Sequence, residues 1–471
     1  MVIREIDTNL ASDALFALFK DRQHVFFLDS ADPHPQLGQF SWIGFEPPVT
    51  IQGKNGQIEI KDRAGHHQYT ADPFTELQAL LRHYQLPRQD DIPFVGGAVG
   101  YFGYDLAHHI ETLPRTTADD LPVPDLFFGI YDGVIIIDHR NDRVHVASPG
   151  LFGDAEAWVA EVESIIHAGE EKSCPTAILL TSNISNPGAI VMTPGFDKSG
   201  YLQAVQKIKD YIEAGDIYQV NLTMRFAARC QLPPFETYQR LRRINPAPFA
   251  AYLDFGQGHI LSSSPERFVQ IRNGRVQTRP IKGTRPRGKT PSEDQANQQE
   301  LASSAKDQAE LLMIVDLERN DLGKVCKPAT VEVTELFKLE TYATVYHLVA
   351  TVEGELEDGL DAIDCIKALF PGGSITGAPK IRAMEIIDEL EPVQRGIYTG
   401  AIGYIGFDGQ ADFNIAIRTI ILTDDHAFFS AGGGVVWDSD PHLEYEEIMH
   451  KSKALLATLD AVSFVPVSTG H

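Results

Sequence analysis

The chain has 471 residues, and at roughly 150 residues per domain it holds about three domains' worth of sequence. Hydrophobic residues make up 43% and charged residues 22%, values typical of globular proteins, which argues against a disordered, fibrous or membrane protein. The formal net charge is −25 with acidic residues spread along the chain, which argues against a nucleic-acid partner because a polyanion is bound by a basic stripe.

The composition of residues 1–171 indicates mixed strands and helices separated by proline-containing turns. The first residues are charged and lack the apolar core of a secretion signal. No segment approaches the ~18 unbroken apolar residues of a membrane helix, so we expect a cytoplasmic protein without a membrane partner. Residues 172–194 lose charge and gain Ser, Asn, Thr and Pro, which predicts a linker.

A nine-residue pattern occurs twice in the chain, as GAVGYFGYD at 97–105 and as GAIGYIGFD at 400–408. It indicates two similar glycine-rich strands in which backbone approaches backbone or ligand closely. One short match is equally compatible with coincidence. The four cysteines show no CxxC spacing, so we expect reduced, mostly packed thiols and no structural zinc.

Beyond the linker, apolar residues at helical spacing predict a helix over 198–214, with Asp197 as its N-cap and Gly215 as its stop. Alternating apolar and polar residues then predict a strand over 218–226. Gln219 lies on the polar face of that strand.

Two ionisable residues lie in segments otherwise typical of a protein core, Glu266 in SSSPERF and Lys282 in PIKGTR. A lysine in a dry pocket can lose its charge and act as a nucleophile, and a buried glutamate can act as a general acid. The alternative for Lys282 is a surface lysine at the end of a strand.

Carboxylates on two predicted helices form a candidate magnesium site. A helix over 300–318 directs Glu310 toward an interior-like face, and Glu444, Glu447 and Lys451 share one face of a C-terminal helix. Two inward carboxylates are what Mg²⁺ needs when water and substrate oxygens complete its octahedron. Taken singly, each glutamate is more often a solvated surface residue.

The segment FPGGSITGAPK at 370–380 predicts a glycine-rich turn that opens a helix. Ala378 and Pro379 stand where a phosphate loop has Lys and Ser or Thr, which excludes a nucleotide triphosphate site. Free amides at such a helix start favour an anion, while the alternative is an ordinary tight turn. A predicted strand over 414–422 places Arg418 on a half-buried face, where it must meet a substrate carboxylate or an acidic residue of the chain.

Together and in this order, these segments resemble the chorismate-utilising enzymes. The resemblance spans roughly Thr193 to Ala457 and rests on the motifs SSSPERF, PIKGTRPRG, SAKDQAELLMIVDLERND, YHLVATV, FPGGSITGAPKIRAMEIIDELE, YTGAIGY and SAGGGVVWDSDP. It implies an α+β fold, an α/β sandwich of largely antiparallel sheets with helices outside and the N- and C-terminal parts interleaved. Residues 195–460 are then the chorismate-binding catalytic region, preceded by the N-terminal region 1–171.

Two positions distinguish the reactions within this family. Where members that add water carry a lysine base, this chain has Gln219 in IYQVNL. Where anthranilate-forming members carry alanine in PIAGT, this chain has Lys282 in PIKGT. The resemblance therefore implies the branch that converts chorismate and ammonia to 4-amino-4-deoxychorismate for 4-aminobenzoate and folate, and anthranilate formation is the alternative.

The resemblance also implies a role for each candidate residue. Lys282 matches a nucleophile that forms a covalent adduct, and Glu266 matches the general acid that protonates the leaving hydroxyl. Glu310 and Glu447 match the ligands of the Mg²⁺ cofactor, with Glu444 close by. The residues matched to substrate binding are His347, Ser374, Tyr398, Arg418, Gly432 and Lys451.

The implied partners are chorismate, ammonia and a glutamine amidotransferase subunit that forms a heterodimer with this chain. The subunit is expected to be separate because no cysteine here lies in a GxCxG turn. The N-terminal region is also similar, less closely, to the tryptophan pocket of anthranilate synthases, with Asp29 in place of Glu and Phe249 in place of Tyr. The residues matched to that pocket are Ser30, Asn245, Pro248 and Phe249.

Overall fold

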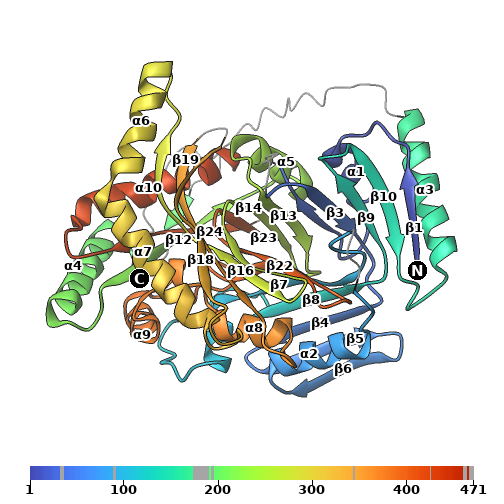
Figure 1. Ribbon diagram of the computed structural model, residues 1–471, viewed down its shortest axis with the longest axis horizontal. Coiled ribbons are helices and arrows are strands. Elements are labelled where there is room, and N and C mark those ends of the chain that lie inside the picture. Colours follow the sequence, from blue (N-terminus) through green and yellow to red (C-terminus); the bar gives the residue numbers. More distant parts are fainter. Residues whose placement is uncertain are drawn as a thin grey trace.

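The computed structural model describes residues 1–31, 37–88, 92–172, 190–192, 196–342, 345–424, 426–459 and 464–465. Two large β-sheets lie face to face, and helices cover their outer faces (Figure 1). The expected α+β sandwich of largely antiparallel sheets with interleaved parts is confirmed.

The first sheet has 13 strands in the described part of the chain. Its pairs are antiparallel except β11 with β25, and β20 (Gly377–Ala378) pairs with β12 off the main path. The order of the other strands is β1 (Val2–Ile6), β10 (Arg143–Ser148), β9 (Val134–Asp138), β3 (Phe40–Gly44), β2 (Phe26–Asp29), β13 (Phe249–Asp254), β14 (His259–Ser264), β23 (Thr419–Thr423), β24 (His426–Val435), β12 (Gln219–Arg229), β11 (Ile190–Met192) and β25 (Phe464–Val465).

The second sheet has 12 described strands, all antiparallel to their neighbours, and β18 (Glu332–Thr341) pairs with β19 off the main path. The order of the other strands is β17 (Ile281–Pro286), β19 (Val345–Glu355), β16 (Arg275–Arg279), β15 (Arg267–Arg272), β22 (Ala411–Ile415), β21 (Ala401–Gly406), β7 (Gly97–Phe102), β8 (Leu126–Tyr131), β4 (Val49–Lys54), β5 (Gln57–Asp62) and β6 (Gly65–Thr70).

Three buried apolar clusters fill the space between the helices and sheets and between the two sheets. The middle cluster joins the two sheets, for example through Phe26 and Ile421 of the first and Tyr101 and Tyr404 of the second. One outer cluster lies under α1 (Ser12–Ala17), α3 (Ala155–Lys172), α4 (Lys198–Ala214), α5 (Pro234–Ile244), α9 (Lys380–Leu390) and α10 (Pro441–Thr458). The other lies under α2 (Pro73–His83), η1 (Tyr104–His109), α6 (Pro291–Ser303), α7 (Ala305–Leu322), α8 (Ala362–Leu369) and η2 (Gly373–Ile375).

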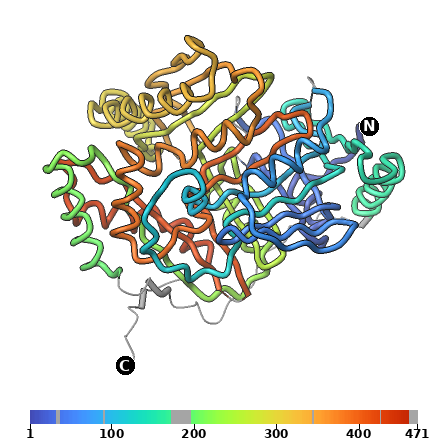
Figure 2. The backbone as a smooth tube through the Cα atoms, turned by 90° about the horizontal axis from the view of Figure 1, so that it is seen from below, coloured from blue at the N-terminus to red at the C-terminus, as the bar shows by residue number. Residues whose placement is uncertain are grey.

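The repeated glycine-rich pattern forms the junction between the two parts of the chain. Strands β7 and β21 pair directly, with Gly100 opposite Gly403, and Figure 2 shows N-terminal and C-terminal backbone running side by side. A Cβ at Gly97 would lie 2.2 Å from the carbonyl oxygen of Ile405 on β21, and one at Gly400 would lie 2.1 Å from that of Phe102 on β7. The expected close approach of backbone to backbone is confirmed.

Local predictions succeed where capping signals are strong. Helix α4 occupies 198–214, the side chain of Asp197 accepts a hydrogen bond from Gly200 N, and Gly215 ends the helix with φ of 84°. The single helix over 300–318 is wrong, because the chain breaks at Ser304, which caps α7 through its hydroxyl. Helix α6 projects from the body as a separate element (Figure 1).

The strand predicted over 414–422 is also wrong. Strand β22 ends at Ile415 and β23 begins at Thr419, while Arg418 adopts a left-handed φ of 50° between them. A left-handed residue interrupts the alternation of side chains, so the face of Arg418 could not follow from strand periodicity.

Most of the predicted linker, 172–194, lies outside the described residues, but its described part 190–192 is strand β11 in the first sheet. The division into regions 1–171 and 195–460 stays a prediction. Cys230, Cys326 and Cys365 are buried free thiols as expected, and Cys174 lies outside the described residues. Among the described residues, no helix has the length and apolar character needed to cross a bilayer.

Candidate active site

Lys282 reaches into the region where β12 and the loop before α9 meet the second sheet. Strand β17 presents its side chain, and Nζ donates a hydrogen bond of 3.2 Å to the carbonyl oxygen of Ser374. The side-chain amide of Asn221, on β12, donates a bond of 2.7 Å to the same oxygen. Burial lowers the pKa of Lys282, and the carboxylates of Glu310 and Glu266 oppose that shift only in part. At a given pH, a larger fraction of this amine is therefore uncharged here than in water.

Glu266 lies in the turn between β14 and β15 and is 5% exposed. Its Oε1 accepts a hydrogen bond of 3.4 Å from the backbone N–H of Ile281, beside Lys282. Burial raises the pKa of Glu266, and nearby Ser374, Lys282 and Arg418 reduce the shift without cancelling it. A carboxyl group whose pKa is raised in this way is suited to general-acid chemistry.

Arg418 and His347 complete the same neighbourhood. The guanidinium of Arg418 donates a bond of 3.1 Å to Oδ1 of Asn245, and its charge lies close enough to Glu266 for each to shift the pKa of the other. His347, on β19, is buried, and its Nδ1 lies 3.0 Å from the hydroxyl of Thr284. Burial and the charge of Arg418 lower the pKa of His347 to about 3, so the imidazole is neutral at physiological pH.

A buried arginine, Arg395, fixes the loop that carries Ser374 to β12. Arg395 donates to the carbonyl oxygen of Ile375 at 3.1 Å and to that of Asn221 at 2.7 Å. Burial raises the pKa of the nearby Tyr398 well above its usual value, although the charge of Arg395 partly offsets this, so the phenol remains protonated. The loop carrying Ser374 is thus fixed to β12 rather than free on the surface.

The predicted metal carboxylates converge on the glycine-rich end of β24. A Cβ at Gly433 would lie 3.2 Å from Oε2 of Glu444 and 3.7 Å from Oε1 of Glu447, both on α10. Burial and the charge of Glu447 raise the pKa of Glu310, on α7, while Lys282 opposes the shift. The three carboxylates therefore share one electrostatic neighbourhood.

This arrangement fits a magnesium ion held by one or two carboxylates. Among the residues that the structure describes, no three acidic, histidine or cysteine side chains form a ready-made cage. Mg²⁺ commonly keeps several waters and takes one or two carboxylates plus substrate oxygens. Lys451 meanwhile forms an ion pair of 2.7 Å with Glu447 and donates a bond of 3.0 Å to the carbonyl oxygen of Gly432. The residues would fit the ion together with an anionic substrate.

Several partners of these residues were not predicted from the sequence. Asn221, Thr284 and Arg395 were not among the candidate residues, and Thr284 and Arg395 carried no recognised signal. The alternation in β12 could have identified Asn221, because it lies two positions after Gln219 on the same face. The contacts of Thr284 and Arg395 depend on tertiary packing alone.

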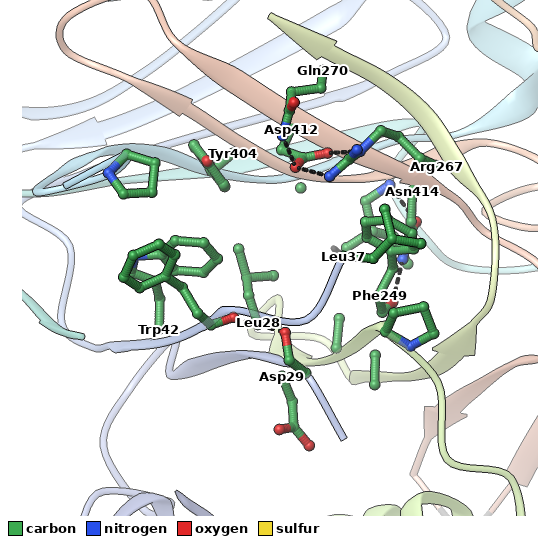
Figure 3. A pocket seen from close by; sticks show the side chains of 18 of the residues that line it. Leu28, Asp29, Leu37, Trp42, Phe249, Arg267, Gln270, Tyr404, Asp412 and Asn414 are labelled. Carbon is green, nitrogen blue, oxygen red and sulfur yellow. Dashed lines mark hydrogen bonds and ion pairs between the residues drawn. The ribbon is translucent and has the colours of Figure 1, made fainter. Parts of the chain in front are cut away.

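A separate pocket lies between the N-terminal strands and the second sheet (Figure 3), with a cavity of about 120 Å³. Trp42 and Tyr404 line one side, and the ion pair of Arg267 with Asp412, 2.9 Å between Nη2 and Oδ2, lines another. Three of the four residues matched to a tryptophan pocket are in its lining, namely Ser30, Pro248 and Phe249. Asn245 is not among the lining residues and instead hydrogen-bonds Arg418.

Comparison with known proteins places the chain among relatives of similar length. A family model described as "chorismate binding enzyme" matches residues 23–457. Aminodeoxychorismate synthase component 1 of Bacillus subtilis (strain 168) is 40% identical over 445 residues, covering 94% of this chain and 93% of its own. Anthranilate synthase component 1 of Acetivibrio thermocellus is 39% identical over 457 residues, covering 95% and 92%. The crystal structure of anthranilate synthase component I from Streptococcus pneumoniae TIGR4 superimposes with a TM-score of 0.77 at 33% identity, covering 88% of this chain and 92% of its own.

Proposed function

Because this chain belongs to the family of chorismate binding enzymes, we propose that it converts chorismate and ammonia to 4-amino-4-deoxychorismate. The observation that carries the proposal is Lys282, whose amine lies in the same neighbourhood as a buried acid, Glu266, and has a lowered pKa. The relatives named aminodeoxychorismate synthase and anthranilate synthase are almost equally similar, so overall identity alone does not choose the product. The product would serve 4-aminobenzoate and folate synthesis.

The first step forms a bond between Nζ of Lys282 and C2 of chorismate. The ring electrons shift along the diene, the C4–O bond breaks, and Glu266 donates its proton so that the hydroxyl leaves as water. Lys282 must be uncharged and Glu266 protonated at the start. Burial favours both forms, because it raises the pKa of the acid and lowers that of the amine.

In the second step ammonia attacks C4, the diene electrons shift back, and the C2–N bond to Lys282 breaks. The lysine leaves as a neutral amine, and the new ammonium at C4 returns one proton to Glu266. The sum is chorismate plus ammonia giving 4-amino-4-deoxychorismate plus water, with both residues restored. No pyruvate is lost, so a separate lyase would complete 4-aminobenzoate.

The other candidate side chains of the site are proposed to bind the substrate. Arg418 and Lys451 would hold carboxylates of chorismate, with Tyr398, His347, Ser374 and the backbone of Gly432 shaping the site. Glu310 and Glu447, with Glu444 beside them, would hold Mg²⁺. The bound ion would supply positive charge that anchors and polarises the ring carboxylate.

Ammonia is proposed to come from a glutamine amidotransferase subunit that forms a heterodimer with this chain. Free ammonia at high pH would substitute for the subunit.

The pocket of Figure 3 is proposed as an amino-acid site for tryptophan, supported by its aromatic side at Trp42 and Tyr404 and its ion pair at Arg267. Its opposed charges suit a zwitterion.

The product decides between the candidate activities. With Mg²⁺, chorismate and ammonium at high pH, mass spectrometry should show 4-amino-4-deoxychorismate, which added lyase converts to 4-aminobenzoate. Anthranilate or isochorismate as the wild-type product would overturn the proposal.

The same assay on Lys282→Ala tests the covalent step. This variant should lose most of that product, and the C2 face would then be open to ammonia. A gain of 2-amino-2-deoxyisochorismate or anthranilate supports the nucleophile role, since a merely damaged site would make neither. Full activity of Lys282→Ala would show that the lysine is only a positioning charge.

A further inference from the structure

The carbonyl oxygen of Ser374 is shared by two donors from different elements. Nζ of Lys282 lies 3.2 Å away and Nδ2 of Asn221 lies 2.7 Å away. A carbonyl oxygen has two lone pairs, so these two hydrogen bonds use its whole accepting capacity. The direction in which Lys282 meets this oxygen is therefore limited to what Asn221 leaves free.

Asn221 is itself held rigidly at three points. Its backbone N–H donates to the carbonyl oxygen of Thr376 at 2.8 Å, its carbonyl oxygen accepts from Arg395 at 2.7 Å, and its side chain binds Ser374. Arg395 also donates to the carbonyl oxygen of Ile375. Three consecutive carbonyls of the loop are thus fixed relative to β12. A loop bound in this way cannot turn the Ser374 carbonyl without breaking several buried hydrogen bonds.

We infer that Asn221 is a positioning residue that, through the Ser374 carbonyl, orients the amine of Lys282 for attack on the substrate. An uncharged amine has two N–H groups and one lone pair. One N–H bound to a fixed carbonyl restricts where the lone pair points, which is the requirement for a near-attack geometry. The inference rests on the proposed function for its catalytic consequence, but the closeness of Asn221 to the amine of Lys282 is testable without any substrate.

The charged groups around Lys282 come from three other elements and do not depend on Asn221. They are Glu266 before β15, Glu310 on α7, and Glu447 and Lys451 on α10. Asn221→Ala removes the donor without adding charge, so it should misdirect the amine while leaving its pKa nearly unchanged. Asn221→Asp keeps the shape and adds a negative charge beside the amine, so it should also raise the pKa of Lys282.

The first measurement is adduct formation with chorismate and Mg²⁺ but no ammonia. Quenched samples analysed by intact mass should show wild-type enzyme gaining chorismate minus water at Lys282. In both Asn221 variants the rate should fall by roughly 10- to 100-fold, while chorismate affinity from equilibrium dialysis stays near wild type. Asn297→Asp is the matched control, because it removes an asparagine donor to a backbone carbonyl, that of Pro286, in a hydrogen bond that is exposed to solvent.

The second measurement uses acetic anhydride, which acetylates only uncharged amines, on enzyme without substrate. The pH midpoint of Lys282 acetylation should move upward in Asn221→Asp and stay near wild type in Asn221→Ala and Asn297→Asp. Wild-type enzyme that forms no adduct would refute the proposed function, and the acetylation profile of Asn221→Asp would still test whether position 221 lies beside the amine of Lys282. The inference would be overturned if both Asn221 variants matched wild type in the rate of adduct formation and in the acetylation midpoint, with unchanged melting temperatures.

Discussion

At the scale of single residues, one physical cause prepares two groups for opposite tasks. Burial raises the pKa of Glu266 and lowers that of Lys282, because a dry site penalises whichever form is charged. An acid that keeps its proton and an amine that gives one up are what a displacement with a poor leaving group needs. Both residues were candidates from the sequence, but the sequence left Lys282 with the alternative of a surface lysine at a strand end. Its environment depends on the elements that pack against β17, which no local pattern encodes.

The carboxylates near Gly433 give a residue-scale prediction about the metal. Replacing Glu447 with Gln should weaken Mn²⁺ binding by roughly tenfold or more, because a neutral amide is a poorer ligand than a carboxylate. Free Mn²⁺ is counted by its electron paramagnetic resonance signal, with and without chorismate, so the readout does not depend on turnover. Glu446→Gln, on the neighbouring exposed position of α10, is the control and should bind as wild type does. If Glu447→Gln bound Mn²⁺ with the affinity of wild type, Glu447 would not be a metal ligand.

At the scale of elements, prediction from sequence succeeded where a local signal determines the structure. Helix α4 has a capping aspartate and a terminal glycine, so both of its ends were predicted correctly. Arg418 was placed on a strand because its neighbours alternate, yet a left-handed turn separates β22 from β23 there. Arg418 donates a hydrogen bond to Asn245, a pairing across 173 residues that no local pattern encodes.

The close packing of β7 against β8 gives a prediction at the same scale. Gly100→Ala would place a methyl group 1.9 Å from the carbonyl oxygen of Phe127, so the strands must separate. We expect a loss of at least about 2 kcal/mol in stability, seen as a lower melting temperature and poorer recovery of folded protein. Gly153→Ala is the control, since a Cβ there meets nothing within 4 Å and its φ is not left-handed. A wild-type melting temperature for Gly100→Ala would mean that the strands are not packed as closely as described.

At the scale of the whole molecule, each sheet is built from strands of both the N-terminal and the C-terminal region. Strands β1, β10, β9, β3 and β2 extend the first sheet beyond β13, and β7, β8, β4, β5 and β6 extend the second beyond β21. The middle apolar cluster likewise combines residues of both parts. The proposed catalytic groups lie after residue 218, yet the sheets that position them are completed by the N-terminal region. Proximity in the chain therefore says little about which residues support the site.

This interleaving predicts how the protein behaves when divided. Expressed alone, residues 1–172 or 190–471 should fail to form a cooperative fold, because each would expose the long edge of two sheets and half of the middle core to water. Expressed together as two chains, they should associate into one complex with near-native circular dichroism and with chorismate turnover, because the same strand pairs can form without the linker. Size-exclusion chromatography and thermal melts of each piece and of the pair provide the measurement. Gly97→Ala in the N-terminal piece should weaken that association, because a Cβ there would lie 2.2 Å from the carbonyl oxygen of Ile405 on β21, whereas Gly153→Ala should not. A monomeric, cooperatively melting fragment of 190–471 would show instead that the C-terminal region is an independent domain and that β7 merely docks against it.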